Sequence, residues 1–321
     1  RATLSYHGLT EHIDRFTCAL NANGDGLDNP SQCIGLNDDT LTKKRVYDDT
    51  VDVLGGDAHA LLSFWDERVR LTLGGDVAHD WVGSERADAK SDAFVFESKD
   101  RGNFSDGSTY LTAGAYLHTA SRLLDFGSSM GEVNLQAGTR YSYFSAHAPD
   151  VPGLGDVSYS YSGAIGSGSL QWLRPGKTNL YVSFSQGFRA PNLQESTVLG
   201  DTGSKFEIPN DQLVPERSDT LEAGFKASVS GFSVSAAWFM SWIQDVIDES
   251  PAEWERQPAI DGKEVIQRVN TAEGRYHGAE GAIAWRLWRF TLAANAAWIV
   301  GDLTRADGET VPARRVPPLS G

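Results

Sequence analysis

Hydrophobic and polar residues alternate one by one along several stretches of this chain. In residues 131–144 and 219–230, most alternate positions are apolar, such as Val133 and Leu135 or Leu221 and Ala223, and most positions between them are polar or small. Residues 67–79 follow the same pattern, with Arg and Asp residues facing away from Val and Leu residues. Because a β-strand points successive side chains to opposite faces, this period of two predicts strands with one apolar and one polar face.

Extending the pattern along the chain predicts twelve strands separated by connections of very unequal length. We expect strands at residues 1–9, 51–64, 67–79, 109–121, 131–144, 157–173, 178–188, 218–229, 232–247, 265–286, 288–302 and 313–321. Long connections (10–50, 80–108, 145–156, 192–217, 248–264 and 303–312) alternate with short turns, as in "RPGK" at 174–177. All long loops then fall at one end of the sheet, which is typical of outer-membrane barrels. A soluble sandwich with Greek-key connections has no reason to keep this order. The expected fold is therefore an all-β, antiparallel transmembrane β-barrel.

Tryptophans support a membrane barrel. Five of them cluster in the last predicted strands, where a membrane barrel would place its aromatic girdles: Trp238, Trp242, Trp285, Trp288 and Trp298. The alternative is that they form the core of a soluble protein. No run of 18 apolar residues is present, which argues against a membrane-spanning helix.

Charge and cysteine content narrow the possible partners and the compartment. The net charge of −15 disfavours a nucleic-acid partner, because the phosphate backbone requires a basic surface. The two cysteines, Cys18 and Cys33, could close a small loop as a disulfide in an oxidising compartment, or remain as two free thiols.

A polar stretch between these cysteines is a candidate calcium site. It places oxygen-bearing side chains around a Gly turn, at Asn21, Asn23, Asp25 and Asp28. The position that a calcium loop fills with a bidentate Glu is Gln32 here. The sequence therefore leaves two interpretations open, a Ca²⁺ loop and a hydrogen-bonded Asx turn.

Three further motifs carry a family resemblance. They are "LYVSFSQGFRAPNLQE", ending at Glu195, "LVPERSDTLEAGFK", which contains Pro215-Glu216 and Glu222-x-Gly224, and "QRVNTAEGRYHGAEGAIAW", which contains Gly278-Ala279-Glu280. Together they resemble the barrel of TonB-dependent outer-membrane receptors. Weaker likeness extends over most of residues 1–321, so the chain resembles a partial receptor barrel without the plug domain.

The resemblance implies a 22-stranded barrel plugged by an N-terminal globular domain, a class of outer-membrane transporter. About twelve strands leave two open edges that lipid does not tolerate, so more chain or another chain is expected to complete the barrel. Arg1 opens directly onto a strand and "RRVPPLSG" stops where one begins, which also suggests part of a longer polypeptide.

The implied function is energy-coupled active transport of a scarce nutrient across the bacterial outer membrane. A siderophore, cobalamin or a saccharide would be the ligand, and a TonB-type energy-coupling complex would act through the plug. The alternative is a structural barrel subunit of a larger envelope assembly, paired at its edges with another chain and without transport activity. In the haem-transporting branch a histidine follows the Phe-Arg-Ala-Pro box, but residues 192–215 contain none.

Within the box, the expected roles are structural rather than catalytic. Gly187 permits close approach of neighbouring atoms to the backbone, Arg189 can bind a carboxylate through two parallel hydrogen bonds, and Pro191 ends the strand ladder. The candidate partners of Arg189 are Glu195, Glu216 and Glu222, while Phe188 and Glu280 belong to the resemblance as motif residues.

The chain also carries one match to a hydrolase motif, Gly-x-Ser-x-Gly at residues 127–131. A nucleophile elbow needs a turn from strand to helix, whereas this match lies in a short connection between two strands. We therefore expect no enzymatic activity from Ser129.

Overall fold

The computed structural model describes residues 1–18, 41–90, 96–99, 102, 104–174, 176–202, 204–260, 262–305 and 308–313. The strands are β1 (Ala2–Cys18), β2 (Leu41–Phe64), β3 (Val69–Lys90), β4 (Phe96–Lys99), β5 (Ser108–Asp125), β6 (Glu132–Val151), β7 (Gly155–Arg174), β8 (Thr178–Arg189), β9 (Gly200–Thr202), β10 (Lys205–Ile208), β11 (Glu216–Val229), β12 (Phe232–Pro251), β13 (Ala259–Ile260), β14 (Lys263–Leu287), β15 (Phe290–Arg305) and β16 (Thr310–Pro312). The described residues also form the short helices α2 (Gly127–Met130) and α3 (Leu193–Thr197).

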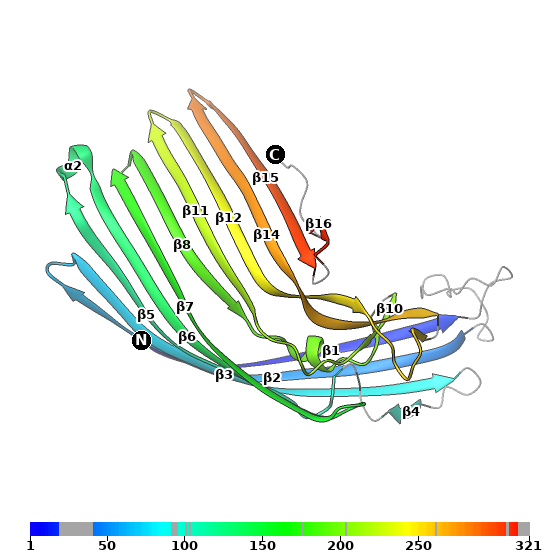
Figure 1. Ribbon diagram of the computed structural model, residues 1–321. Coiled ribbons are helices and arrows are strands. Elements are labelled where there is room, and N and C mark those ends of the chain that lie inside the picture. Colours follow the sequence, from blue (N-terminus) through cyan, green and yellow to red (C-terminus); the bar gives the residue numbers. More distant parts are fainter. Residues whose placement is uncertain are drawn as a thin grey trace.

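The strands form one large curved sheet in which chain neighbours are mostly spatial neighbours (Figure 1). Its main order is β1-β2-β3-β5-β6-β7-β8-β11-β12-β14-β15, and every adjacent pair in this series is antiparallel. The exception is β10, which pairs in parallel with β14. The predicted antiparallel all-β architecture is confirmed, and the described strands curve without closing into a ring.

Several strands are longer than the sequence pattern predicts, mostly on the side of the long connections, although β5 also extends to Asp125 on the side of the short turns. β1 continues to Cys18 and β2 already begins at Leu41. The connection predicted as a long loop at 145–156 is a turn of residues 152–154, because β6 and β7 both extend into it. The strand predicted at 313–321 lies almost wholly outside the described residues, and β16 precedes it.

Register across the strands separates the two faces of the sheet. Leu180, Val182 and Phe184 of β8 lie opposite Phe225, Ala223 and Leu221 of β11. The same rows continue into β12 as Ala236, Trp238 and Met240. We call this side the apolar face. Leu221 to Val229 spans nine residues, about what a tilted strand needs to cross a bilayer.

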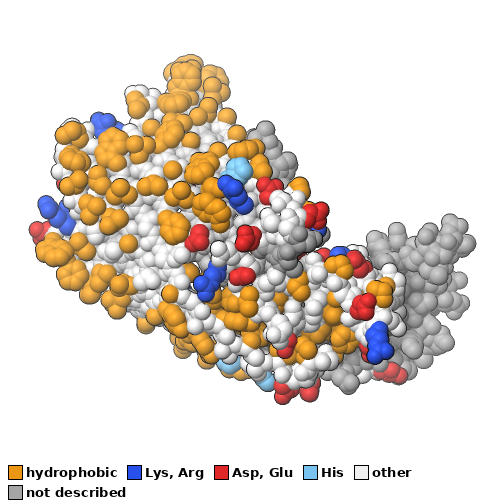
Figure 2. All heavy atoms as spheres, in the orientation of Figure 1, with side chains coloured by type: hydrophobic (Ala, Val, Ile, Leu, Met, Phe, Trp, Pro, Cys, Tyr) orange, Lys and Arg blue, Asp and Glu red, His pale blue; other side chains and the backbone are white. Residues whose placement is uncertain are grey.

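Tryptophans and other large hydrophobic residues are exposed on this sheet. The five tryptophans of the last strands are between 39% and 80% exposed, so they are not core residues. Figure 2 shows hydrophobic side chains spread mostly over the part of the sheet that bears the short turns, and charged ones nearer the opposite end. Among the described residues, no helix has both the length and the apolar character that crossing a membrane requires.

The short connections follow the turn chemistry of the sequence. The turn between β2 and β3 holds Trp65, Asp66 and Glu67 at positive φ, and Ser230-Gly231 forms the turn between β11 and β12. The Gly-x-Ser-x-Gly match forms the single helical turn α2 between strands β5 and β6. It is therefore not the strand-to-helix elbow of a hydrolase.

Candidate functional site

Arg189, the last residue of β8, joins three segments of the chain, β8, α3 and β11. Its Nε donates to Glu216 Oε2 at 2.7 Å, and Glu216 is its direct partner in the β8–β11 register. Its Nη1 donates to both oxygens of Glu195 at 3.0 and 2.9 Å. The two carboxylate side chains are only 19% and 17% exposed. The guanidinium thus compensates two largely buried negative charges.

Helix α3 follows directly because Pro191 ends the ladder. The Asn192 side chain accepts from Glu195 N at 2.8 Å, and Asn192 N donates to Glu195 Oε2 at 3.1 Å. This reciprocal capping box satisfies backbone donors at the start of a helix. Glu195 therefore has two tasks, to cap α3 and to receive Arg189.

Tyrosines from neighbouring strands hold the turn of the box, and sequence reasoning did not single them out. The hydroxyls of Tyr110 on β5 and Tyr159 on β7 donate to the Pro191 carbonyl at 3.3 and 3.4 Å. Tyr159 also lies 3.1 Å from the Ser196 hydroxyl. The sequence held only a weak signal for them, because each is an aromatic residue on the polar side of its strand. We call that side of the sheet the polar face.

Hydrogen bonds within this cluster shift the pKa values of Glu216 and Arg189. Burial raises the pKa of Glu216, but the bonds from Arg189 and from Ile247 N outweigh it and bring the pKa below its usual value. The same contact with Glu216 raises the pKa of Arg189. The apolar rows of β11 begin at Leu221, and Asp219 is the first charged residue on the loop side of them. Arg189 and Glu216 lie on the loop side of Asp219 and so outside the membrane-spanning part.

Other residues of the family motifs lie elsewhere. Glu222 accepts from the Tyr181 hydroxyl at 2.7 Å rather than from Arg189. Glu280 lies opposite Ala237 on the polar face and is exposed. Phe188 packs against Phe144, with ring centroids 5.7 Å apart. Of the three proposed Arg189 partners, the structure thus brings Glu195 and Glu216 to the guanidinium and leaves Glu222 with Tyr181.

A second ion pair crosses the polar face nearer its middle. Arg140 on β6 donates from Nη1 and Nη2 to the two oxygens of Asp76 on β3, at 2.7 and 2.9 Å. The strand between them, β5, places Gly114 under the guanidinium. A Cβ on that glycine would lie 2.1 Å from Arg140 Nη2, so the bridge depends on the absence of a side chain there.

Two predicted features lie outside the described residues. The calcium candidates Asn21, Asn23, Asp25 and Asp28 fall in the segment 19–40, as does Cys33, the proposed partner of Cys18. Within the part of the chain that the structure describes, no group of three or more His, Cys, Asp or Glu residues could hold a metal ion.

Known receptors resemble parts of this chain in sequence. The hemin receptor of Yersinia enterocolitica is 29% identical over 102 residues, and that of Yersinia pestis is 31% identical over 103 residues. Each alignment covers 29% of this chain and 14% of the relative.

Solved structures share the fold over almost the whole chain. The copper transporter OprC superposes with a TM-score of 0.72 at 17% identity, over 99% of this chain and 45% of its own. The ferric enterobactin receptor PfeA of Pseudomonas aeruginosa gives 0.60 at 16% identity, over 95% and 45%. This chain therefore spans less than half of either protein.

A family model decides the assignment. The model described as TonB dependent receptor-like, beta-barrel matches residues 1–321. Together with the antiparallel sheet and its opposed apolar and polar faces, this match shows that the chain belongs to the TonB-dependent receptor-like β-barrel family, an outer-membrane family of transporters rather than enzymes.

Proposed function

We propose that this chain forms part of the wall of an energy-coupled outer-membrane transporter that accumulates a scarce nutrient. The observation that carries the proposal is the family match over residues 1–321. The sheet supports it, because its apolar face suits lipid and its polar face, with the Asp76–Arg140 pair, suits a lumen.

A siderophore, cobalamin or a saccharide is the proposed ligand class, and a plug domain together with a TonB-type complex would release it inward. Glu280 and the Tyr181–Glu222 pair would face that plug from the polar face. The similarity to the two Yersinia hemin receptors makes haem a further ligand to test. No imidazole would come from residues 192–215, because the seven histidines all lie elsewhere.

Uptake by cells that express the full-length receptor tests this function. We expect surface binding of the cognate nutrient to survive a protonophore and its accumulation to stop. The panel comprises ferric siderophores, cobalamin, oligosaccharides and haem, each supplied as the limiting nutrient. Accumulation that persists in de-energised cells would contradict active transport. If no nutrient binds or accumulates, a structural barrel subunit becomes the better explanation.

A further inference from the structure

The connection between β8 and β11 is much longer than its ends require. Arg189 and Glu216 are direct partners in the sheet, yet 26 residues separate them. We call residues 190–215 the strap. It leaves β8, reaches past β11 and β12, and pairs with β14 through β10. We propose that the strap is a fixed part of the inner wall, locked at its far end by Glu207 and Arg268, rather than a gate that opens for the ligand.

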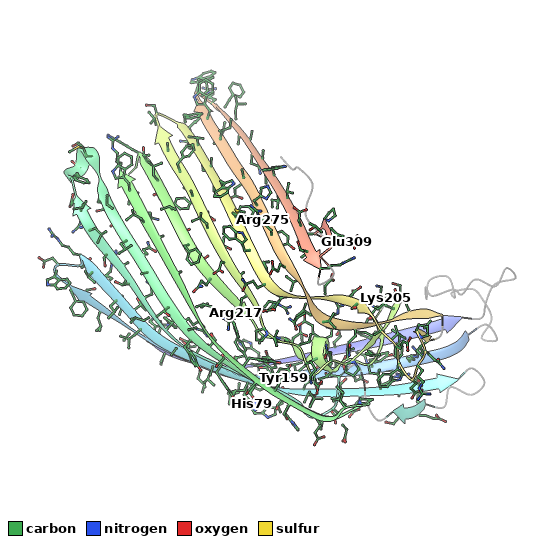
Figure 3. All side chains as sticks on the ribbon, viewed as in Figure 1. His79, Tyr159, Lys205, Arg217, Arg275 and Glu309 are labelled. Carbon is green, nitrogen blue, oxygen red and sulfur yellow. The ribbon has the colours of Figure 1, made fainter. Side chains whose placement is uncertain are left out.

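The near end of the strap is buried against the wall. Leu193, Ser196 and Thr197 of α3 are all buried, and Thr197 is fully covered. The tyrosines at Pro191 and Ser196 fix this end from β5 and β7. In Figure 1, α3 lies on the concave side of the sheet, and Figure 3 shows Tyr159 beside it.

The far end is held by backbone pairing and by charge. β10 pairs with residues 264–267 of β14. Glu207, only 1% exposed, accepts from Arg268 Nε at 2.7 Å. Arg268 Nη2 also lies 3.3 Å from Glu249, and Lys205, labelled in Figure 3, donates to the same carboxylate at 3.0 Å. Four charged groups thus tie β10 to β12 and β14.

The returning part of the strap is fastened by amide side chains that donate to backbone carbonyls. Gln267 Nε2 donates to the Pro209 carbonyl at 2.7 Å, and Asn210 Nδ2 donates to the Arg268 carbonyl at 2.6 Å. Asn270 Nδ2 then donates to the Val214 carbonyl at 2.9 Å. A segment held at both ends and along its return path has few ways to open locally, since opening free energies follow burial and hydrogen bonding.

We call the Glu207–Arg268 ion pair the latch, and its two residues differ in how many partners they have. Glu207 Oε2 is buried without a hydrogen-bond partner in the described part of the chain, so its charge depends on Arg268. Arg268 has Glu249 as a second partner. Removing the arginine leaves a desolvated carboxylate, whereas removing the carboxylate charge leaves a paired arginine. Arg268→Gln is therefore expected to free the strap more than Glu207→Gln.

Thiol labelling of the full-length receptor in intact outer membranes tests the proposal. Val265 is 0% exposed and pairs with Phe206 of the strap, so Val265→Cys in a Cys18→Ser/Cys33→Ser background reports opening. A membrane-impermeant maleimide should label it at least tenfold more slowly than Gln212→Cys, an exposed strap position, with or without an energised membrane. Arg268→Gln should raise Val265→Cys labelling about tenfold and Glu207→Gln should raise it less.

Arg305→Gln is the matched control, because Arg305 pairs with Glu309 at 3.3 Å away from the strap. It should leave the labelling unchanged. Gel mobility of the folded barrel shows which variants have folded. If Arg268→Gln does not fold, Arg268→Lys, which keeps the charge, should give intermediate labelling. The proposal fails if Val265→Cys reacts as fast as Gln212→Cys with the latch intact. It also fails if the folded latch variants label no faster than Arg305→Gln.

Discussion

At the residue scale, the Phe-Arg-Ala-Pro box is a junction built around one guanidinium. Arg189 meets a carboxylate from the helix that follows the box and a second one from the next strand of the sheet. Pro191 ends the ladder, and its own carbonyl is used by two tyrosines. Because each partner comes from a different segment, the box fixes where the strap leaves the wall.

Glu216 gives this junction a pH dependence. Its pKa in the folded chain is lowered below 4.5, so its contribution to stability is present above pH 4.5 and is lost as the pH falls through the folded value. We expect Glu216→Gln to lower the free energy of unfolding by about 1–2 kcal/mol at neutral pH. Urea unfolding of the full-length receptor in lipid vesicles between pH 7 and pH 3 measures it. The difference from wild type should shrink below pH 4.5; a difference independent of pH would contradict the assigned role.

At the element scale, alternation predicted the strands well where lipid makes it necessary. β11 and β12 were predicted to within a few residues, because one face of each must be apolar. The pattern fails near the long connections. The end of β6 contains Pro149 and Asp150, and the end of β1 has few apolar residues among several charged ones, so the sequence there is typical of a loop. The three-residue turn at 152–154 was missed for this reason.

The strap could not be predicted from sequence for a different physical reason. Its pairing with β14 joins residues about sixty positions apart, and Glu207 and Arg268 match no local motif. The contacts of Arg189 with Glu195 and Glu216 could be predicted because these residues belong to the family motifs. The tyrosines that complete the junction occupy ordinary strand positions, and only their three-dimensional placement identifies them.

Glycine determines whether the Asp76–Arg140 bridge can cross β5. An Ala at position 114 would displace the guanidinium, so we expect Gly114→Ala to cost about 1 kcal/mol of unfolding free energy. Gly168→Ala is the matched control: its nearest neighbour is an oxygen at 3.8 Å, and the change should be neutral or slightly stabilising. In an Asp76→Asn background, Gly114→Ala should behave like the control. Equal costs in the wild-type and Asp76→Asn backgrounds would show that the cost of Gly114→Ala does not come from the bridge.

At the scale of the whole molecule, the sheet is a wall between two environments. The rows of apolar side chains on one face end at Asp219, while ion pairs and tyrosines occupy the other face. The strap leaves the wall on this second face, where Tyr110 and Tyr159 hold its first residues. An outer-membrane barrel requires this separation, because lipid cannot satisfy charges but a lumen can.

Two adjacent alanines on β12 test which face meets lipid. Ala236 lies opposite Phe225 in the middle of the apolar rows, whereas Ala237 lies opposite Gly224 and Glu280 on the polar face. Ala236→Lys should cost about 2–4 kcal/mol of stability in a bilayer, because it places a charge in hydrocarbon. Ala237→Lys should cost much less, since Glu280 is its neighbour. Urea unfolding of both variants in lipid vesicles measures the difference. If Ala237→Lys proved the more damaging change, the assignment of the two faces would have to be reversed.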